Sequence, residues 1–124
     1  MATTAAYLES YEGETRKRQT LQLTNLNQAV EAKGGHLIIA VMPLLYDFET
    51  YPFEDIHKAM ADICEVNQLH CLDLLSSLRV HTASSLWVHP VDHHPNEIAH
   101  GILADQLADY ILREQLLTKS ETKK

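Results

Sequence analysis

Side chains that could do chemistry are concentrated in residues 87–100, which run Trp-Val-His-Pro-Val-Asp-His-His-Pro-Asn-Glu-Ile-Ala-His. This stretch holds four of the eight histidines of the chain, together with an aspartate. An imidazole can take a proton from a weakly nucleophilic hydroxyl at neutral pH, and a carboxylate bonded to its other ring nitrogen fixes its tautomer. The stretch is therefore the candidate site, with acid–base chemistry and metal binding as the two uses to weigh.

Three helices are predicted around this stretch. Residues 16–33 place leucine and valine at helical spacing and are followed by Gly34-Gly35, which suits a left-handed C-terminal cap. Pro52 is followed by acidic residues in a first turn and by apolar residues at helical spacing through Cys64. Asn96 suits the N-cap of a last helix. The predicted core face of that helix comprises Ile98, Ile102, Leu107 and Ile111.

Two short apolar runs, residues 36–41 and 69–72, are typical of strands buried on both faces, which belong to parallel sheets. The order helix, strand, helix, strand, helix predicts an α/β fold with a βαβ crossover. Residues 82–95 are predicted to be a long connection. Because doubly wound sheets normally have about five strands, two strands indicate part of a larger sheet.

The block Asp-His-His-Pro-Asn at residues 92–96, followed by His100 and an apolar helix over 102–111, resembles the C-terminal block of the SGNH (GDSL-like) hydrolases. These are esterases and acylhydrolases with a three-layer α/β/α flavodoxin-like fold. The resemblance extends over about residues 16–112. It is supported upstream by Met42-Pro43, Tyr51-Pro52-Phe53 and Leu72-Asp73-Leu74.

The resemblance implies that His94 is the general base and that Asp92 orients it. It further implies a small-molecule ester or acylated substrate, an acyl-serine intermediate, and no metal or organic cofactor. The residue before a proline favours extended backbone, so Pro95 is expected to aim the His94 imidazole from a stiff junction. Trp87 and Tyr46 are expected either to line an acyl pocket or to belong to the core.

The chain departs from the family pattern in two ways. The family usually places two residues between the aspartate and the histidine, whereas only His93 separates Asp92 from His94. Its nucleophile lies in a Gly-Asp-Ser block and further oxyanion donors in a Gly-x-Asn block, and none of the four glycines here begins either. Ser84 and Ser85 lack the glycine pattern of a nucleophile turn. We therefore expect the C-terminal part of such a domain, nearly inactive alone, since each oxyanion donor contributes about 10²–10³ in rate.

Two alternatives remain open at this point. Zinc accepts imidazole and carboxylate ligands, which His89, His93, His94 and Asp92 could supply. A non-catalytic α/β module would instead complete its short sheet against a partner chain or a second copy, because an unpaired strand edge invites association.

Composition excludes some classes of function. Lys and Arg number 10 against 17 Asp and Glu, so the net charge of −7 argues against general binding to nucleic acid or to anionic membranes. The basic runs at residues 16–18 and 119–124 are expected to be solvated surface. No apolar run approaches the roughly 18 residues that span a bilayer, which makes a cytoplasmic location the default expectation.

The remaining expectations concern organisation and single residues. Residues 1–15 are predicted to be a flexible N-terminal segment, 16–117 the α/β domain and 118–124 a polar tail. Cys64 and Cys71 are too few for a disulfide framework and are interpreted as small buried apolar residues. Asp73 is expected to cap the turn after the second strand.

Overall fold

The computed structural model describes residues 4–9 and 11–117; the predicted polar tail, 118–124, lies outside the described residues, as do residues 1–3 and 10. The chain is mixed α/β. Its elements are α1 (Thr4–Glu9), α2 (Gly13–Ala32), β1 (Ile38–Val41), η1 (Phe48–Thr50), α3 (Glu54–Val66), β2 (His70–Asp73), α4 (Leu75–Leu78), η2 (Ala83–Leu86), β3 (Trp87–His89), β4 (Asp92–Pro95) and α5 (Glu97–Arg113). No helix among the described residues has the length and apolar character that a membrane crossing needs.

The chain divides into two compact units, and each is described by itself. The first comprises the described residues up to Pro43 together with Glu49–Asp73, and the second comprises Leu44–Phe48 and the described residues from Leu74 onward.

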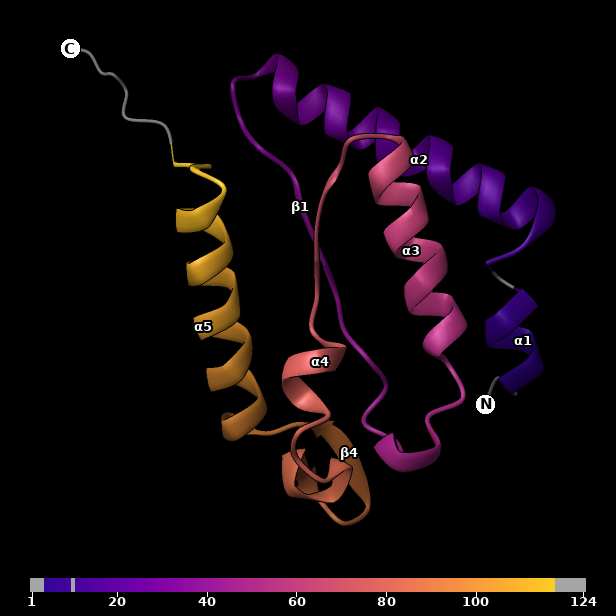
Figure 1. Cartoon of the computed structure of the whole chain (residues 1–124), viewed down its shortest axis with the longest axis vertical. Coiled ribbons are helices and arrows are strands. Elements are labelled where there is room, and N and C mark those ends of the chain that lie inside the picture. The colour runs from indigo at the N-terminus through magenta and orange to yellow at the C-terminus, as the bar shows by residue number, and fades with distance from the viewer. Residues whose placement is uncertain (1–3, 10, 118–124) are drawn as a thin grey trace. The chain divides into compact units, whose positions relative to one another are not determined.

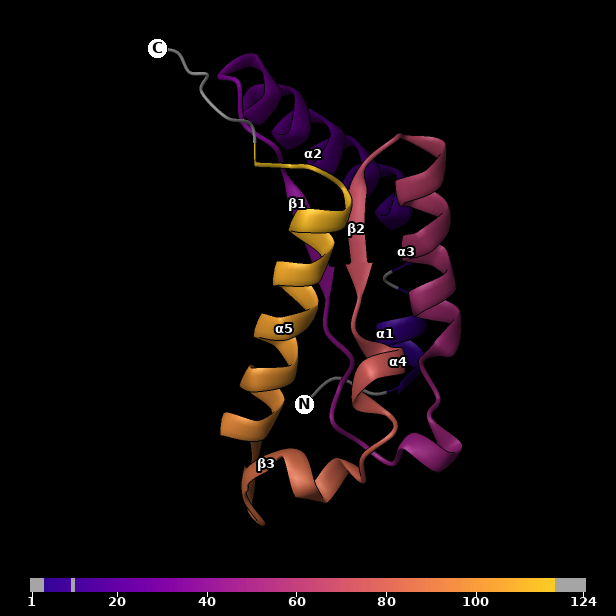
Figure 2. The ribbon, with the colours of Figure 1, turned by 60° about the vertical axis from the view of Figure 1, so that its left-hand side comes forward.

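In the first unit, β1 pairs in parallel with β2, and Ile38 lies opposite His70. Helix α3 connects the two strands and runs alongside β2 (Figures 1 and 2). The predicted parallel pair and its helical crossover are therefore confirmed. The prediction of strands buried on both faces is wrong for Ile38, Ile39 and Val41, which are only half-buried within this chain.

The core of the first unit lies on one face of α3, as the apolar spacing predicts. Met60, Ile63 and Cys64 form its centre. Half-buried side chains from α2, both strands and the flanking turns pack against this centre: Tyr11, Leu23, Ile39, Val41, Leu69 and Cys71. At the end of α2, Gly34 has φ of 82°, so the predicted left-handed cap is confirmed.

The N-terminal segment contains helix that the sequence pattern does not predict. Helix α1 lies within the segment predicted to be flexible, and α2 begins at Gly13 rather than at Arg16. Tyr11, between α1 and α2, packs against the core centre on α3. A single aromatic in a polar segment gives no periodic signal from which this contact could be predicted.

Cys64 and Cys71 form a disulfide, which corrects their interpretation as independent buried residues. Cys64 is buried on α3, and Cys71 is half-buried on β2. The chain turns back directly after α3 through Gln68, whose φ is 56°, so the strand returns beside the helix that precedes it. The two Cα atoms are 6.2 Å apart, a separation that a disulfide can span.

In the second unit, residues 82–95 are not a loop. They form the short helix η2 and an antiparallel hairpin in which β3 pairs with β4, with Trp87 opposite Pro95 and His89 opposite Asp92. Helix α5 leaves the hairpin directly (Figure 1). Leu74, Leu78 and Leu86 are the most completely buried side chains of the unit.

Helix α5 begins where predicted, but its buried face differs from the predicted one. Ala99 and Tyr110 are buried, whereas Ile98 is 50% exposed. Ile102, Leu107 and Ile111 are half-buried. The buried positions are thus the small Ala99 in the first turn and the large Tyr110 near the C-terminal end of the helix.

Candidate functional site

The structure brings Asp92 and His94 together on β4. Alternate residues of an extended strand point to the same face, so a single intervening residue places the carboxylate beside the imidazole. The Oδ1 atom of Asp92 accepts a hydrogen bond from Nδ1 of His94 at 2.5 Å and another from its backbone N–H at 3.2 Å. The side chains are 48% and 85% exposed, respectively. The pair lies at the surface, where another molecule can reach it.

This pairing sets the charge and the tautomer of the site. The hydrogen bond from the His94 side chain, followed by that from its backbone, lowers the pKa of Asp92 below its ordinary value of 3.8. A carboxylate accepts only if Nδ1 carries the proton, which leaves Nε2 of His94 as the acceptor in the neutral ring. Within the described part of the chain, that nitrogen has no hydrogen-bond partner. It is therefore available to a hydroxyl from outside this set of residues.

The face of the hairpin opposite to Asp92 and His94 carries Trp87 and His93, and it attaches the hairpin to the preceding chain. The rings of Trp87 and His93 are stacked, with centroids 3.6 Å apart and planes 8° from parallel. The Trp87 indole N–H donates to the carbonyl of Leu45 at 2.9 Å, and Nε2 of His93 contacts the carbonyl of Pro90 at 3.0 Å. Trp87 thus fastens the hairpin to residues 44–48 and does not share a face with His94, which argues against its role in an acyl pocket beside that histidine.

Asn96 joins the hairpin to α5. Its Oδ1 accepts from the backbone N–H groups of Ile98 and Ala99, both at 3.0 Å, which confirms the predicted N-cap. Its Nδ2 donates to the carbonyls of Ser85 and Trp87 at 2.9 and 3.1 Å. The site histidine, two residues earlier, is therefore next to a fixed junction.

Neither serine considered in the sequence is placed as a nucleophile for His94. The Ser85 hydroxyl donates to the carbonyl of Thr82 at 2.7 Å. Ser84 is exposed at the surface of η2. Neither hydroxyl is hydrogen-bonded to His94.

The other histidines of the stretch are also accounted for. His89 is exposed, and its Nδ1 accepts from the backbone N–H of Val91 at 3.3 Å. His93 and His100 are exposed as well. Over residues 4–9 and 11–117, no group of three or more His, Cys, Asp or Glu side chains is arranged to hold a metal ion.

Sequence reasoning missed a second aspartate–histidine pair, which lies in the first unit. Nδ1 of His57, on α3, donates to both carboxylate oxygens of Asp73, at 2.8 and 2.9 Å. The Tyr51 hydroxyl lies 2.9 Å from Nε2 of the same ring. Asp73 therefore binds a histidine on the crossover helix, in addition to ending β2. A signal was present: His57 precedes Met60 by three residues and so falls on the apolar face of α3.

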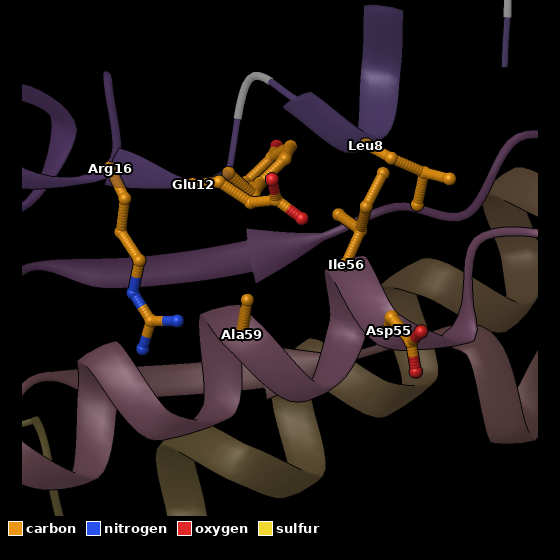
Figure 3. Close-up of a pocket in the computed structure, with 7 residues that line it drawn as sticks. Leu8, Glu12, Arg16, Asp55, Ile56 and Ala59 are labelled. Atoms are coloured by element: carbon orange, nitrogen blue, oxygen red, sulfur yellow. The ribbon is translucent and has the colours of Figure 1, made fainter. Parts of the chain in front are cut away.

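A cavity of about 210 Å³ lies elsewhere in the first unit, between α1, α2 and α3. Figure 3 shows Leu8 and Ile56 close to each other at one end, with Arg16 at the other. The charged side chains around it are Glu12, Arg16 and Asp55, and its lining contains neither a histidine nor a serine. It therefore holds carboxylates but no imidazole that could act as His94 does.

No protein-family model matches the chain, and no curated protein or solved structure matches it significantly.

Proposed function

We propose that this chain is the part of an SGNH-type ester hydrolase that carries the general base. His94 removes the proton of a serine hydroxyl through Nε2, and Asp92 holds the ring in the required tautomer and stabilises the imidazolium that forms. The observation that supports this role is the 2.5 Å hydrogen bond between Asp92 Oδ1 and His94 Nδ1, with Nε2 left open.

We further propose that β1, α3, β2 and α5 belong to a three-layer flavodoxin-like domain whose remaining strands lie outside this chain. The parallel pairing of β1 with β2 supports this arrangement. The serine and the oxyanion donors then come from another segment, because no glycine of the chain begins a Gly-Asp-Ser or a Gly-x-Asn block. The substrate is a carboxylic or acyl ester, and no metal or organic cofactor takes part.

The rate at which the chain alone hydrolyses an ester tests whether His94 acts as a general base. With p-nitrophenyl acetate, we expect slow hydrolysis that the His94→Ala variant largely loses, since the imidazole that takes a proton from the attacking water has been removed. His93→Ala is the matched control, because His93 is the adjacent histidine and lies on the opposite face. Equal rates for the wild type and His94→Ala would contradict the role of His94.

A serine-directed fluorophosphonate tests where the nucleophile lies. We expect no labelling of the chain, since Ser84 and Ser85 are not bonded to His94. Rapid turnover that depends on His94 but resists the fluorophosphonate would overturn the serine mechanism itself. The gene sequence upstream of the Met1 codon gives a second test, because an in-frame Gly-Asp-Ser segment is expected there. An in-frame stop codon in its place would contradict a single-chain enzyme.

A second candidate function, a module that pairs its sheet with a second copy, is favoured by the strands themselves. Among the described residues, β1 and β2 pair only with each other, although Ile38, Ile39 and Val41 are half-buried apolar side chains on a strand edge. Such an edge can add a strand from another chain.

Sedimentation velocity distinguishes this candidate. Ala40→Lys places a charge at an exposed position of β1 and is expected to convert a dimer into a monomer. Ala61→Lys, at an exposed position of α3, is the control and should leave the dimer intact. A wild-type chain that sediments as a monomer at all concentrations would exclude pairing between copies.

A further inference from the structure

Asn96 uses its side chain in two directions at once. Toward α5, Oδ1 accepts two backbone N–H groups of the first turn. Toward the hairpin, Nδ2 donates to two carbonyls on either side of Leu86. Its backbone N–H also donates to the carbonyl of Leu86 at 2.9 Å. Both amide hydrogens and the amide oxygen are therefore occupied, which is nearly the full capacity of an asparagine side chain.

Capping alone does not require these donors. A helix N-cap needs one side-chain oxygen, and aspartate or serine supplies it about as well as asparagine. The two amide N–H groups are additional, and they reach back eleven and nine residues to the carbonyls of Ser85 and Trp87. Among the good capping residues, only asparagine offers an acceptor and two amide donors on one short side chain.

The position of Asn96 links this junction to the site. It follows His94 by two residues, and the intervening Pro95 restricts the backbone of His94. Asp92, at the start of β4, is 48% exposed, and its carboxylate accepts hydrogen bonds from the side chain and the backbone of His94. His94 lies near the C-terminal end of β4. The hydrogen bonds donated by the Asn96 side-chain amide therefore hold this end of the strand against η2 and β3.

We propose that Asn96 is a positioning residue for the Asp92–His94 pair, acting through its amide donors and separately from its capping of α5. The functional part of this proposal rests on the proposed role of His94 as a base. Loss of the donors frees the C-terminal end of β4, so the imidazole spends less time against the carboxylate. Misplacement of a catalytic group by about 1 Å can cost up to about 10²-fold in rate.

Two substitutions separate the roles. Asn96→Ser keeps a neutral capping oxygen but lacks the amide donors, whereas Asn96→Ala lacks both. Leu116→Ala is the matched control, because Leu116 is buried beyond the far end of α5 in the same unit, away from the hairpin. Asn96→Thr, which also caps, replaces the serine variant if that variant does not fold.

The decisive measurement is the Asp92 titration by ¹³C NMR, with circular dichroism to follow the helix. In Asn96→Ser we expect the Asp92 midpoint to rise toward 3.8, its ordinary value, while α5 stays helical. Turnover of p-nitrophenyl acetate should fall by about tenfold, within the range that misplacement produces. Leu116→Ala should lower the melting temperature and leave the midpoint unchanged.

A midpoint in Asn96→Ser equal to that of the wild type would overturn the proposal and leave Asn96 as a cap alone. The same holds if Leu116→Ala moves the midpoint as much as Asn96→Ser does, because the shift would then follow general destabilisation. A failure of the proposed function can be distinguished from a failure of this inference. If His94→Ala does not change turnover, the base role fails, whereas the Asp92 titration still decides whether Asn96 positions the pair.

Discussion

His94 and His57 each donate a hydrogen bond from Nδ1 to an aspartate, but they differ in whether Nε2 can reach another molecule. The His94 side chain is 85% exposed, and its Nε2 is open to another molecule. The His57 side chain is 8% exposed, and its Nε2 faces the Tyr51 hydroxyl. The first can exchange a proton with a molecule from outside the chain, while the second already has both ring nitrogens bonded within the protein. Accessibility of Nε2, rather than the pair itself, therefore separates the site from the internal bond.

The lowered pKa of Asp92 predicts a pH dependence with a definite sign. The carboxyl loses its proton more readily in the folded chain, so its contribution to stability is complete above the ordinary value of 3.8. That contribution declines as the pH falls through the folded value, and it is absent below it. A ¹³C NMR titration should show the low midpoint in the wild type and in His93→Ala, and a return toward the ordinary value in His94→Ala. A midpoint insensitive to His94 would refute the pairing.

Breaking the hydrogen bond between His57 and Asp73 is expected to lower the stability of the fold. In His57→Ala, the Tyr51 hydroxyl and the Asp73 carboxylate both lose the same partner, so we expect the free energy of unfolding to fall by about 1–3 kcal/mol. Urea denaturation measures this loss. His36→Ala, at an exposed histidine, should change the free energy by less than about 0.5 kcal/mol. Equal effects of the two substitutions would show that the bonded network contributes no stability.

At the scale of elements, the sequence predicted those features that depend on residues close together in the chain. The cap at Asn96, the left-handed turn at Gly34 and the apolar face of α3 were all predictable, because each depends on neighbouring residues. The β3–β4 hairpin was not, since its strands are three and four residues long, contain Pro95 and show no apolar alternation.

The candidate site shows the same limit. Asp92 and His94 were identified from a short histidine-rich stretch and from the resemblance of residues 92–96 to a family block, both of which depend only on neighbouring residues. His57 and Asp73 were not paired because they are 16 residues apart, and only the return of β2 beside α3 brings them together. The disulfide between Cys64 and Cys71 depends on that same return.

The disulfide between Cys64 and Cys71 links β2 to α3, and both its presence and its contribution to stability can be measured. Intact mass should show the loss of two hydrogen atoms, and iodoacetamide should not label the unfolded chain until a reductant is added. Reduction should lower the free energy of unfolding by about 2 kcal/mol, the chain-entropy value for a bridge across seven residues. A Cys64→Ala/Cys71→Ala chain is the control and should not respond to reductant. Alkylation of both thiols in the untreated protein would contradict the bond.

At the scale of the whole molecule, the chain carries a net negative charge of −7. With 17 acidic against 10 basic side chains, we expect no binding of a labelled oligonucleotide at physiological salt, as measured by fluorescence anisotropy. Replacing Arg16, Lys17 and Arg18 by alanine should not alter the result, because these residues form only a short run on α2. Salt-sensitive binding that this triple replacement abolishes would show that the run is an anionic ligand site.

The extended backbone of β4 also decides which insertions the site tolerates. With one intervening residue, a strand presents Asp92 and His94 on the same side; with two, a strand would send them to opposite sides. The spacing of the pair and the conformation of its backbone therefore depend on each other. On an extended strand, one inserted residue would turn the two side chains to opposite faces, and two inserted residues would place their Cα atoms about 13 Å apart, so either insertion breaks the pair unless the backbone turns.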